Sequence, residues 1–225
     1  GVVFVCATLL RSWITQRTDS WQAILAIVGG QGFGKTTLAR RLTDWILDSD
    51  GNPVLLFSAG STASAIRDAM VSARDLCLSA STQLQRKYRD LGAQLVREGA
   101  NAAPITKKLP GGKASKLKCV AGVILTAEFA LENGSDITRS IFLNVDKPLH
   151  LPQSLSSELL GSACAQFLQW FLPHELKIAK WLNEPTQEKK RGLFHPRVEA
   201  NFDVLDTIFE AMAHATLATG APKSC

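Results

Sequence analysis

The chain has 225 residues, of which 46% are hydrophobic and 20% charged, and its formal net charge is +5. This composition supplies enough apolar side chains for a core and excludes a disordered or low-complexity protein. The apolar stretch at residues 1–10 stops at Arg11, well short of the roughly 18 residues of a membrane span, and it lacks the basic leader of a signal peptide. We expect one large domain, or a core with a small lid, and no membrane insertion. Because residue 1 is not methionine, we also expect a longer parent protein.

In chain order, residues 2–16 predict a helix packed on the core, and the apolar residues 23–28 predict a buried strand. The strand is followed by the phosphate-binding pattern G-x-x-x-x-G-K-[ST], which here consists of Gly29, Gly30, Gln31, Gly32, Phe33, Gly34, Lys35 and Thr36. Residues 37–47 then predict a helix, because their apolar side chains recur at helical spacing. A strand, a glycine-rich loop and a helix start in this order are typical of a nucleotide site.

The residue types in this loop (the P-loop) suit phosphate. Glycines allow the backbone to curl so that its N–H groups point at phosphate oxygens, and the start of the helix, with Thr37, adds its dipole. Lys35 is expected to reach the β- and γ-phosphates, and the Thr36 hydroxyl to ligate Mg²⁺. We therefore predict ATP and Mg²⁺ as the cofactors of this loop.

The rest of the chain alternates strands and helices to about residue 150 and is helical beyond it. The patterns predict strands at 54–58, 120–125 and 141–145, and helices at 61–74, 81–98, 157–172 and 202–217. Such alternation predicts an α/β fold with a mostly parallel sheet and a nucleotide at its carboxyl edge. We expect residues 1–150 to form the P-loop core, with its N-terminal packing helix, and residues 151–225 to form a helical lid.

The cysteines are odd in number, and no pair has metal-binding or redox spacing; they are Cys6, Cys77, Cys119, Cys164 and Cys225. We expect them to behave as buried small hydrophobic side chains. This usage favours a reducing, cytoplasmic compartment.

The positive charge is concentrated in one segment. Residues 86–118 hold nine basic side chains and two acidic ones, so this segment carries +7 and the rest of the chain −2. Within it, a Pro-Gly-Gly turn stands between two lysine-bearing arms and predicts a hairpin over residues 106–118. This concentration indicates a specific anionic partner, and a solvated basic loop is the alternative. The lysines of the expected hairpin are Lys107, Lys108, Lys113, Lys116 and Lys118.

A P-loop enzyme usually has a carboxylate at the end of a second apolar strand, where it holds Mg²⁺. The apolar run at 76–78 is too short for a complete strand, and the three residues after it provide no acid. One interpretation is that residues are missing just before Asp75, so that Asp75 ends an absent strand and ligates the metal. In that case Thr126 and Glu128 sense the γ-phosphate. Alternatively, Glu128 is itself the acid that polarises water.

The order of these parts resembles that of the AAA+ ATPases. Within them it looks most like the replicative helicases of mobile elements and phages, which are related to the minichromosome-maintenance and superfamily-three helicases. The resemblance rests on the P-loop and on the segments 122–128 and 135–140, and it covers about residues 20–150. It implies an AAA+-like three-layer core and an ATP-hydrolysing motor that acts on DNA as a homo-oligomer, a hexameric ring.

The resemblance also implies roles for two arginines and for the hairpin. Arg139 stands where the family has an arginine that reaches the ATP site of the next subunit, where a guanidinium stabilises charge on the γ-phosphate. Arg197, at an expected helix start in the lid, would be a second phosphate sensor. The hairpin would project into the central pore, where its lysines would bind DNA phosphates without reading bases. For each arginine, a plain surface role is the alternative.

Two other functions stay open on the sequence alone. A P-loop switch or scaffold would bind nucleotide to control assembly and hydrolyse little, which the uncertain carboxylate favours. A small-molecule kinase would need an acceptor pocket and a catalytic base, and the sequence identifies neither. DNA-stimulated ATPase activity that is lost on Lys35→Ala distinguishes the motor from both.

Overall fold

The computed structural model describes residues 1–18, 21, 23–47, 50, 56–57, 63–81, 93, 96–97, 100, 104–108, 114–118, 121–128, 132–152, 156–183 and 195–218. Its helices are α1 (Val2–Leu9), α2 (Arg11–Thr15), α3 (Lys35–Thr43), α4 (Ala63–Ala73), α6 (Gly134–Ile137), α7 (Ser157–Asn183) and α8 (Pro196–Ala218). Its strands are β1 (Ile24–Gly29), β2 (Leu56–Phe57), β3 (Cys77–Ser81), β4 (Pro104–Lys108), β5 (Ala114–Lys118), β6 (Gly122–Ala127) and β7 (Ser140–Val145).

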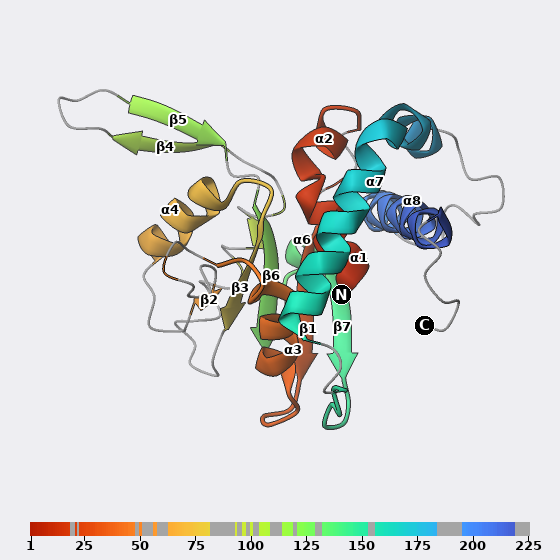
Figure 1. Cartoon of the computed structure of the whole chain (residues 1–225). Helices are drawn as coiled ribbons and strands as arrows, with labels where there is room; N and C mark the ends of the chain where they lie inside the picture. The colour runs from red at the N-terminus through yellow and green to blue at the C-terminus, as the bar shows by residue number, and fades with distance from the viewer. Residues whose placement is uncertain are drawn as a thin grey trace.

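The centre of the fold is a five-stranded sheet in the order β2-β3-β6-β1-β7, in which every neighbouring pair is parallel. Helices lie on both sides of it (Figure 1). The first four residues of β1 and all six of β6 are buried, as expected for strands covered on both faces. The prediction of an α/β fold with a parallel sheet is confirmed.

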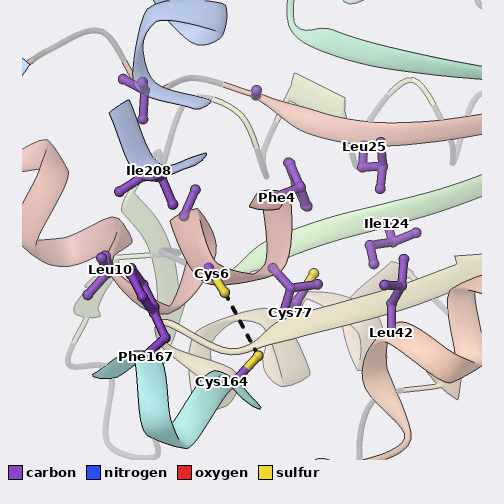
Figure 2. Packing of buried hydrophobic residues seen from close by; sticks show 14 of the residues in the cluster. Phe4, Cys6, Leu10, Leu25, Leu42, Cys77, Ile124, Cys164, Phe167 and Ile208 are labelled. Atoms are coloured by element: carbon purple, nitrogen blue, oxygen red, sulfur yellow. Dashed lines mark hydrogen bonds between the residues drawn. The ribbon is translucent and has the colours of Figure 1, made fainter. Parts of the chain in front are cut away.

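One face of the sheet is covered by α1 and α3, and α7 and α8 pack against these helices. Leu25 of β1 and Ile124 of β6 belong to the same buried cluster as Phe4 of α1, Phe167 of α7 and Ile208 of α8. Figure 2 shows these side chains coming together from strands and helices that are far apart in the sequence. The two C-terminal helices therefore share a core with the sheet, and the division into a core at 1–150 and a lid at 151–225 stays a prediction.

The opposite face packs against α4. There Met70 and Ala73 join Leu78 of β3 and Leu125 of β6 in a second buried cluster. Alternate residues of β1, β3 and β6 thus belong to opposite clusters, which is the period-two pattern of a strand buried on both sides.

Several expected elements differ in extent. The helix expected at 2–16 is divided into α1 and α2 at Leu10, and the helix expected at 157–172 continues as α7 through Pro173 to Asn183. Most of the helix expected at 81–98 lies outside the described residues. Residue 81 itself is the last residue of β3, so the interpretation of the run at 76–78 as an incomplete strand is wrong. β3 continues through the serines because tertiary pairing with β6 extends it.

Three cysteines are buried and reduced, as expected: Cys6, Cys77 and Cys164. The sulfur atoms of Cys6 and Cys164 lie 3.9 Å apart, between α1 and α7 (Figure 2). Burial raises the pKa of the Cys77 thiol to about 12. Cys119 and Cys225 lie outside the described residues.

Gly122 of β6 packs closely against Thr8 of α1. A Cβ atom at Gly122 would lie 2.2 Å from Cγ2 of Thr8, which is fully buried. We expect Gly122→Ala to lower the free energy of unfolding by about 1–3 kcal/mol, because a well-packed core does not accept the added methyl group without moving. Urea denaturation measures this change. The Thr8→Ala/Gly122→Ala double variant should recover part of the loss, and additive losses would contradict this contact as the cause.

Candidate nucleotide-binding site

The P-loop connects the carboxyl end of β1 to the start of α3. Gly32 and Gly34 have φ angles of +76° and +83°, in the left-handed region that side chains disfavour. Gly34 is also the N-cap residue of α3. The glycine pattern of the sequence therefore has a direct conformational cause at these two positions.

Two other glycines of the loop are closely packed, and Gly29 has no room for a side chain. A Cβ atom at Gly29 would lie 2.3 Å from the carbonyl oxygen of Val145, and one at Gly30 would lie 3.0 Å from the ring of Phe33. The N–H of Leu149 donates to the Phe33 carbonyl at 3.1 Å. The segment after β7 thus supports the loop along one side, and both lie at the same end of the sheet in Figure 1. Sequence reasoning missed this support, because no local pattern pairs residues 33 and 149.

Lys35 is held inside the loop. Its side chain is 8% exposed, and its Nζ donates to the carbonyl oxygens of Gly29 at 2.8 Å and of Gly30 at 2.6 Å. The amine is therefore positioned beside the glycines before any anion arrives. Thr36 and Thr37 are exposed on the first turn of α3. A glycine cradle, an enclosed ammonium group and an open helix start together fit a nucleotide phosphate group.

The carboxyl end of β6 lies next to this loop. Thr126 pairs with Ile27 and Ala127 with Val28 in the parallel register, so Glu128 follows at the level where the P-loop begins. Thr126 is buried and Glu128 is partly exposed. The structure thus brings these two predicted residues to the same edge of the sheet as Lys35.

Asp75 lies at the opposite edge. It precedes β3, and its carboxylate accepts a hydrogen bond of 2.6 Å from the N–H of Ser12 in α2. In a parallel sheet the start of β3 is a full strand length from the P-loop. The interpretation of Asp75 as the residue that ends a strand and ligates Mg²⁺ is therefore corrected: Asp75 connects α2 to the sheet.

Arg139 also lies at the amino edge of the sheet. Its carbonyl oxygen accepts from the N–H of Ile24, the first residue of β1, at 3.0 Å. The guanidinium donates to the carbonyl of Ser135 at 2.6 Å and to the hydroxyl of the same residue. Burial, followed by the nearby charge of Arg197, lowers the pKa of Arg139, while Asp136 opposes this shift. Arg139 is thus removed from the P-loop of its own chain.

Arg197 shares this location. Arg197 lies at the start of α8, and its positive charge helps to lower the pKa of Arg139. Arg197 is therefore not positioned as a sensor for the P-loop of the same chain. A third arginine, Arg97, donates to both oxygens of the buried Asp136, at 2.9 and 3.1 Å. This pairing raises the pKa of Arg97. The amino edge therefore holds three arginines, of which Arg97 pairs with the Asp136 carboxylate.

The expected basic hairpin is present. β4 and β5 form a separate antiparallel pair, in register from Pro104 with Lys118 to Lys108 with Ala114. The hairpin extends away from the central sheet (Figure 1). Four of the predicted lysines lie in these two strands: Lys107 and Lys108 in β4, and Lys116 and Lys118 in β5. Lys113 lies outside the described residues. Strand alternation groups positions 108, 116 and 118 on one face of the hairpin and position 107 on the other.

Two classes of site receive no support within the described residues. None of the described helices combines the length and apolarity of a membrane-spanning segment. Across the same residues, His, Cys, Asp and Glu side chains nowhere gather in threes as a metal site. On the P-loop, the exposed Thr36 hydroxyl is a group that suits Mg²⁺ together with phosphate oxygens.

Comparison with solved structures identifies a similar fold. The structure described as "SCCmec type IV Cch - active helicase" has a TM-score of 0.66 and 14% sequence identity, over 95% of this chain and 43% of that chain. The chain thus spans less than half the length of that helicase, and the likeness at this identity is one of fold. No model of a protein family matches the chain. No curated protein matches it either.

Gly29 provides a test of the support from β7. We expect Gly29→Ala to lower the free energy of unfolding by about 1–3 kcal/mol and to weaken nucleotide binding, because the methyl group would displace the Val145 carbonyl. Urea denaturation and titration with a fluorescent ATP analogue measure the two effects. Gly134→Ala is the matched control, since a Cβ there meets no atom within 4 Å. Unchanged nucleotide affinity in Gly29→Ala would contradict the role of this contact.

Proposed function

We propose that this chain is the ATP-binding and ATP-hydrolysing domain of a helicase-type motor of the AAA+ kind, which acts on DNA as an oligomer. The observation that carries the proposal is the enclosure of Lys35 by Gly29 and Gly30 at the carboxyl edge of a parallel sheet. The likeness in fold to a structure described as a helicase supports the same class.

The position of Arg139 supports an oligomer. β1 has six residues, so its two ends are about 17 Å apart at ~3.3 Å per residue. Arg139 lies at the first residue of β1 and the P-loop at the last, which is too far for an arginine side chain to reach. A role in ATP hydrolysis therefore requires Arg139 to act on the P-loop of a neighbouring subunit. Closed rings follow naturally from such head-to-tail contacts, and a hexamer is the form we propose.

The chain's own residues have distinct roles in this proposal. Lys35 and the loop N–H groups bind the phosphates of ATP, and Thr36 faces the metal. Glu128 accepts a proton from the attacking water, and Thr126 senses the γ-phosphate beside it. Mg²⁺, when bound with ATP, neutralises charge that develops on the phosphate oxygens.

A P-loop switch with little hydrolysis is the second candidate. The observation that favours it is the end of β3, which pairs with β6 at this edge but carries no acid. The motor predicts turnover that DNA stimulates, whereas the switch predicts nucleotide binding that is indifferent to DNA.

The decisive experiment combines two inactive variants. We expect single-stranded DNA to stimulate ATP turnover by the wild-type protein, and both Lys35→Ala and Arg139→Ala to abolish it, since each removes a group that stabilises phosphoryl transfer. An equal mixture of the two variants should regain roughly a quarter of the activity, because random assembly creates interfaces with an intact loop and an intact arginine. Phosphate release measures the turnover.

Lys177→Ala is the control for the loss of a positive charge, since this exposed residue of α7 lies outside the three arginines, the P-loop and the segment that supports the loop. No recovery in the mixture would contradict action between subunits. If the wild-type protein binds ATP but DNA does not stimulate turnover, the P-loop switch is the better description of this chain.

The hairpin generates a separate prediction. We expect the Lys108→Ala/Lys116→Ala/Lys118→Ala variant to bind single-stranded DNA more weakly, with the slope of log affinity against log salt reduced by about 2, because each phosphate contact contributes about 0.7. Fluorescence anisotropy at several salt concentrations measures the slope. A triple substitution of the exposed Lys147, Lys177 and Lys180 is the matched control. An equal change of slope in both variants would show that only net charge matters.

A further inference from the structure

Two cysteine side chains face each other between the helices that cover the sheet. Cys6 lies in α1 and Cys164 in the first half of α7, 158 residues apart in the sequence. Their sulfur atoms are 3.9 Å apart, and each residue is only 1% exposed. Figure 2 shows the two thiols pointing toward one another. The fold therefore brings together two thiols that no sequence spacing pairs.

A disulfide between these cysteines requires only a small movement. Bonded sulfur atoms are about 2.05 Å apart, so the two sulfurs must approach each other by about 2 Å. Rotation about the two Cα–Cβ bonds moves sulfur atoms by distances of this order. The two helices already share one buried cluster, to which Phe4 of α1 and Phe167 of α7 belong. A disulfide at this place is therefore compatible with the packing of the helices.

The contact between the sulfurs gives the two thiols different reactivity. A hydrogen bond with Cys6 stabilises the thiolate of Cys164 and lowers its pKa, although burial opposes this shift. The same hydrogen bond, together with burial, raises the pKa of Cys6. Cys164 is therefore the sulfur that attacks an oxidant, and Cys6 is the sulfur that attacks the oxidised Cys164.

Cys77 of β3 provides a comparison within the same core. It belongs to the same buried cluster as Cys6 and Cys164. Burial raises the pKa of its thiol to about 12, and a thiol that stays protonated is a poor nucleophile. Burial alone therefore does not make a cysteine of this core reactive, and the difference at Cys164 is the neighbouring sulfur of Cys6.

We propose that Cys6 and Cys164 are an oxidation site, at which hydrogen peroxide creates a disulfide that fastens α1 to α7 and a thiol reductant removes it. The Cys164 thiolate attacks one oxygen of the peroxide: an S–O bond forms, the O–O bond breaks, and the leaving hydroxide takes up the proton of the thiol as water. The Cys6 sulfur then attacks the sulfur of the sulfenic acid: the S–S bond forms, the S–O bond breaks, and a second water leaves. The two thiols lose two electrons, which the peroxide gains.

The inference does not depend on ATP binding, and it agrees with the expected reducing compartment. There the pair stays as two thiols, and disulfides are transient responses to oxidants. Because both cysteines are buried, the reaction proceeds when α1 and α7 separate locally and admit the small oxidant. The pair therefore responds to oxidation more slowly than an exposed thiol does.

The bond would act on a part of α7 that packs near the end of α3. Cys164 lies about one turn after Gly161, which packs against Trp45, two residues beyond the end of α3. The bond would also link residues that are 158 positions apart. A cross-link over so long a stretch removes many conformations from the unfolded chain, so the oxidised protein should be the more stable form.

The test treats the folded wild-type protein with hydrogen peroxide, blocks the remaining thiols after denaturation and identifies linked peptides by mass spectrometry. We expect the Cys6–Cys164 cross-link as the main product. Oxidation should also raise the melting temperature by roughly 5 °C or more, and dithiothreitol should reverse both changes.

Two variants separate this pair from other thiols. Cys164→Ala and Cys77→Ala each remove one buried thiol from the same cluster, so they are matched in their cost to packing. Cys77→Ala should still form the cross-link and gain stability on oxidation, whereas Cys164→Ala should do neither. Wild-type protein that is oxidised while unfolded in guanidinium chloride should give a mixture of pairs, because the contact between α1 and α7 is then lost.

Two results would overturn the inference. One is a folded wild-type protein in which peroxide leaves Cys6 and Cys164 as thiols or oxidises them without a cross-link, a measurement that needs no variant to fold. The other is a melting temperature that oxidation leaves unchanged in the wild type, or raises equally in Cys164→Ala.

Discussion

The rest of the site depends on the ammonium group of Lys35 being held by the carbonyl oxygens of Gly29 and Gly30. A buried charge is stable only when polar groups satisfy it, and here the loop backbone does so. The loop keeps this shape because Val145 of β7 closes against Gly29 and leaves no room for a side chain. The pairing of β7 with β1 is therefore a condition for the chemistry and not only for the fold.

The parallel sheet gives the two edges of the domain different roles. The carboxyl edge holds Lys35, Thr126 and Glu128, whereas the amino edge holds Arg139, Arg197 and the Asp136–Arg97 pair. Because a full strand separates the edges, no movement of side chains brings these groups together in one chain. In the motor that we propose, Arg139 therefore acts on the P-loop of a second chain.

Local patterns predicted the P-loop, the parallel sheet and the basic hairpin, because each depends on residues that are close in sequence. The errors arose where tertiary contacts decide. β3 was not predictable as a full strand, since serine and alanine have weak strand preference and pairing with β6 extends it. Asp75 and Arg197 were assigned to the P-loop because sequence order does not show which edge of the sheet a residue occupies. The contact of Leu149 with Phe33 had no sequence signal at all.

The segment between β7 and α7 is hydrogen-bonded to the P-loop and to α3, and so it links the nucleotide site to the C-terminal helices. Leu149 donates to Phe33 in the loop, and Arg41 of α3 donates to the carbonyl of Pro152 at 2.9 Å, a few residues before α7 begins. Within α7, Gly161 packs against Trp45, leaving 3.1 Å between an added Cβ and that side chain. Since α7 and α8 share one core with α1 and β1, a shift of the loop is resisted by close-packed side chains. The position of the P-loop is therefore coupled to that of α7 through the segment that follows β7.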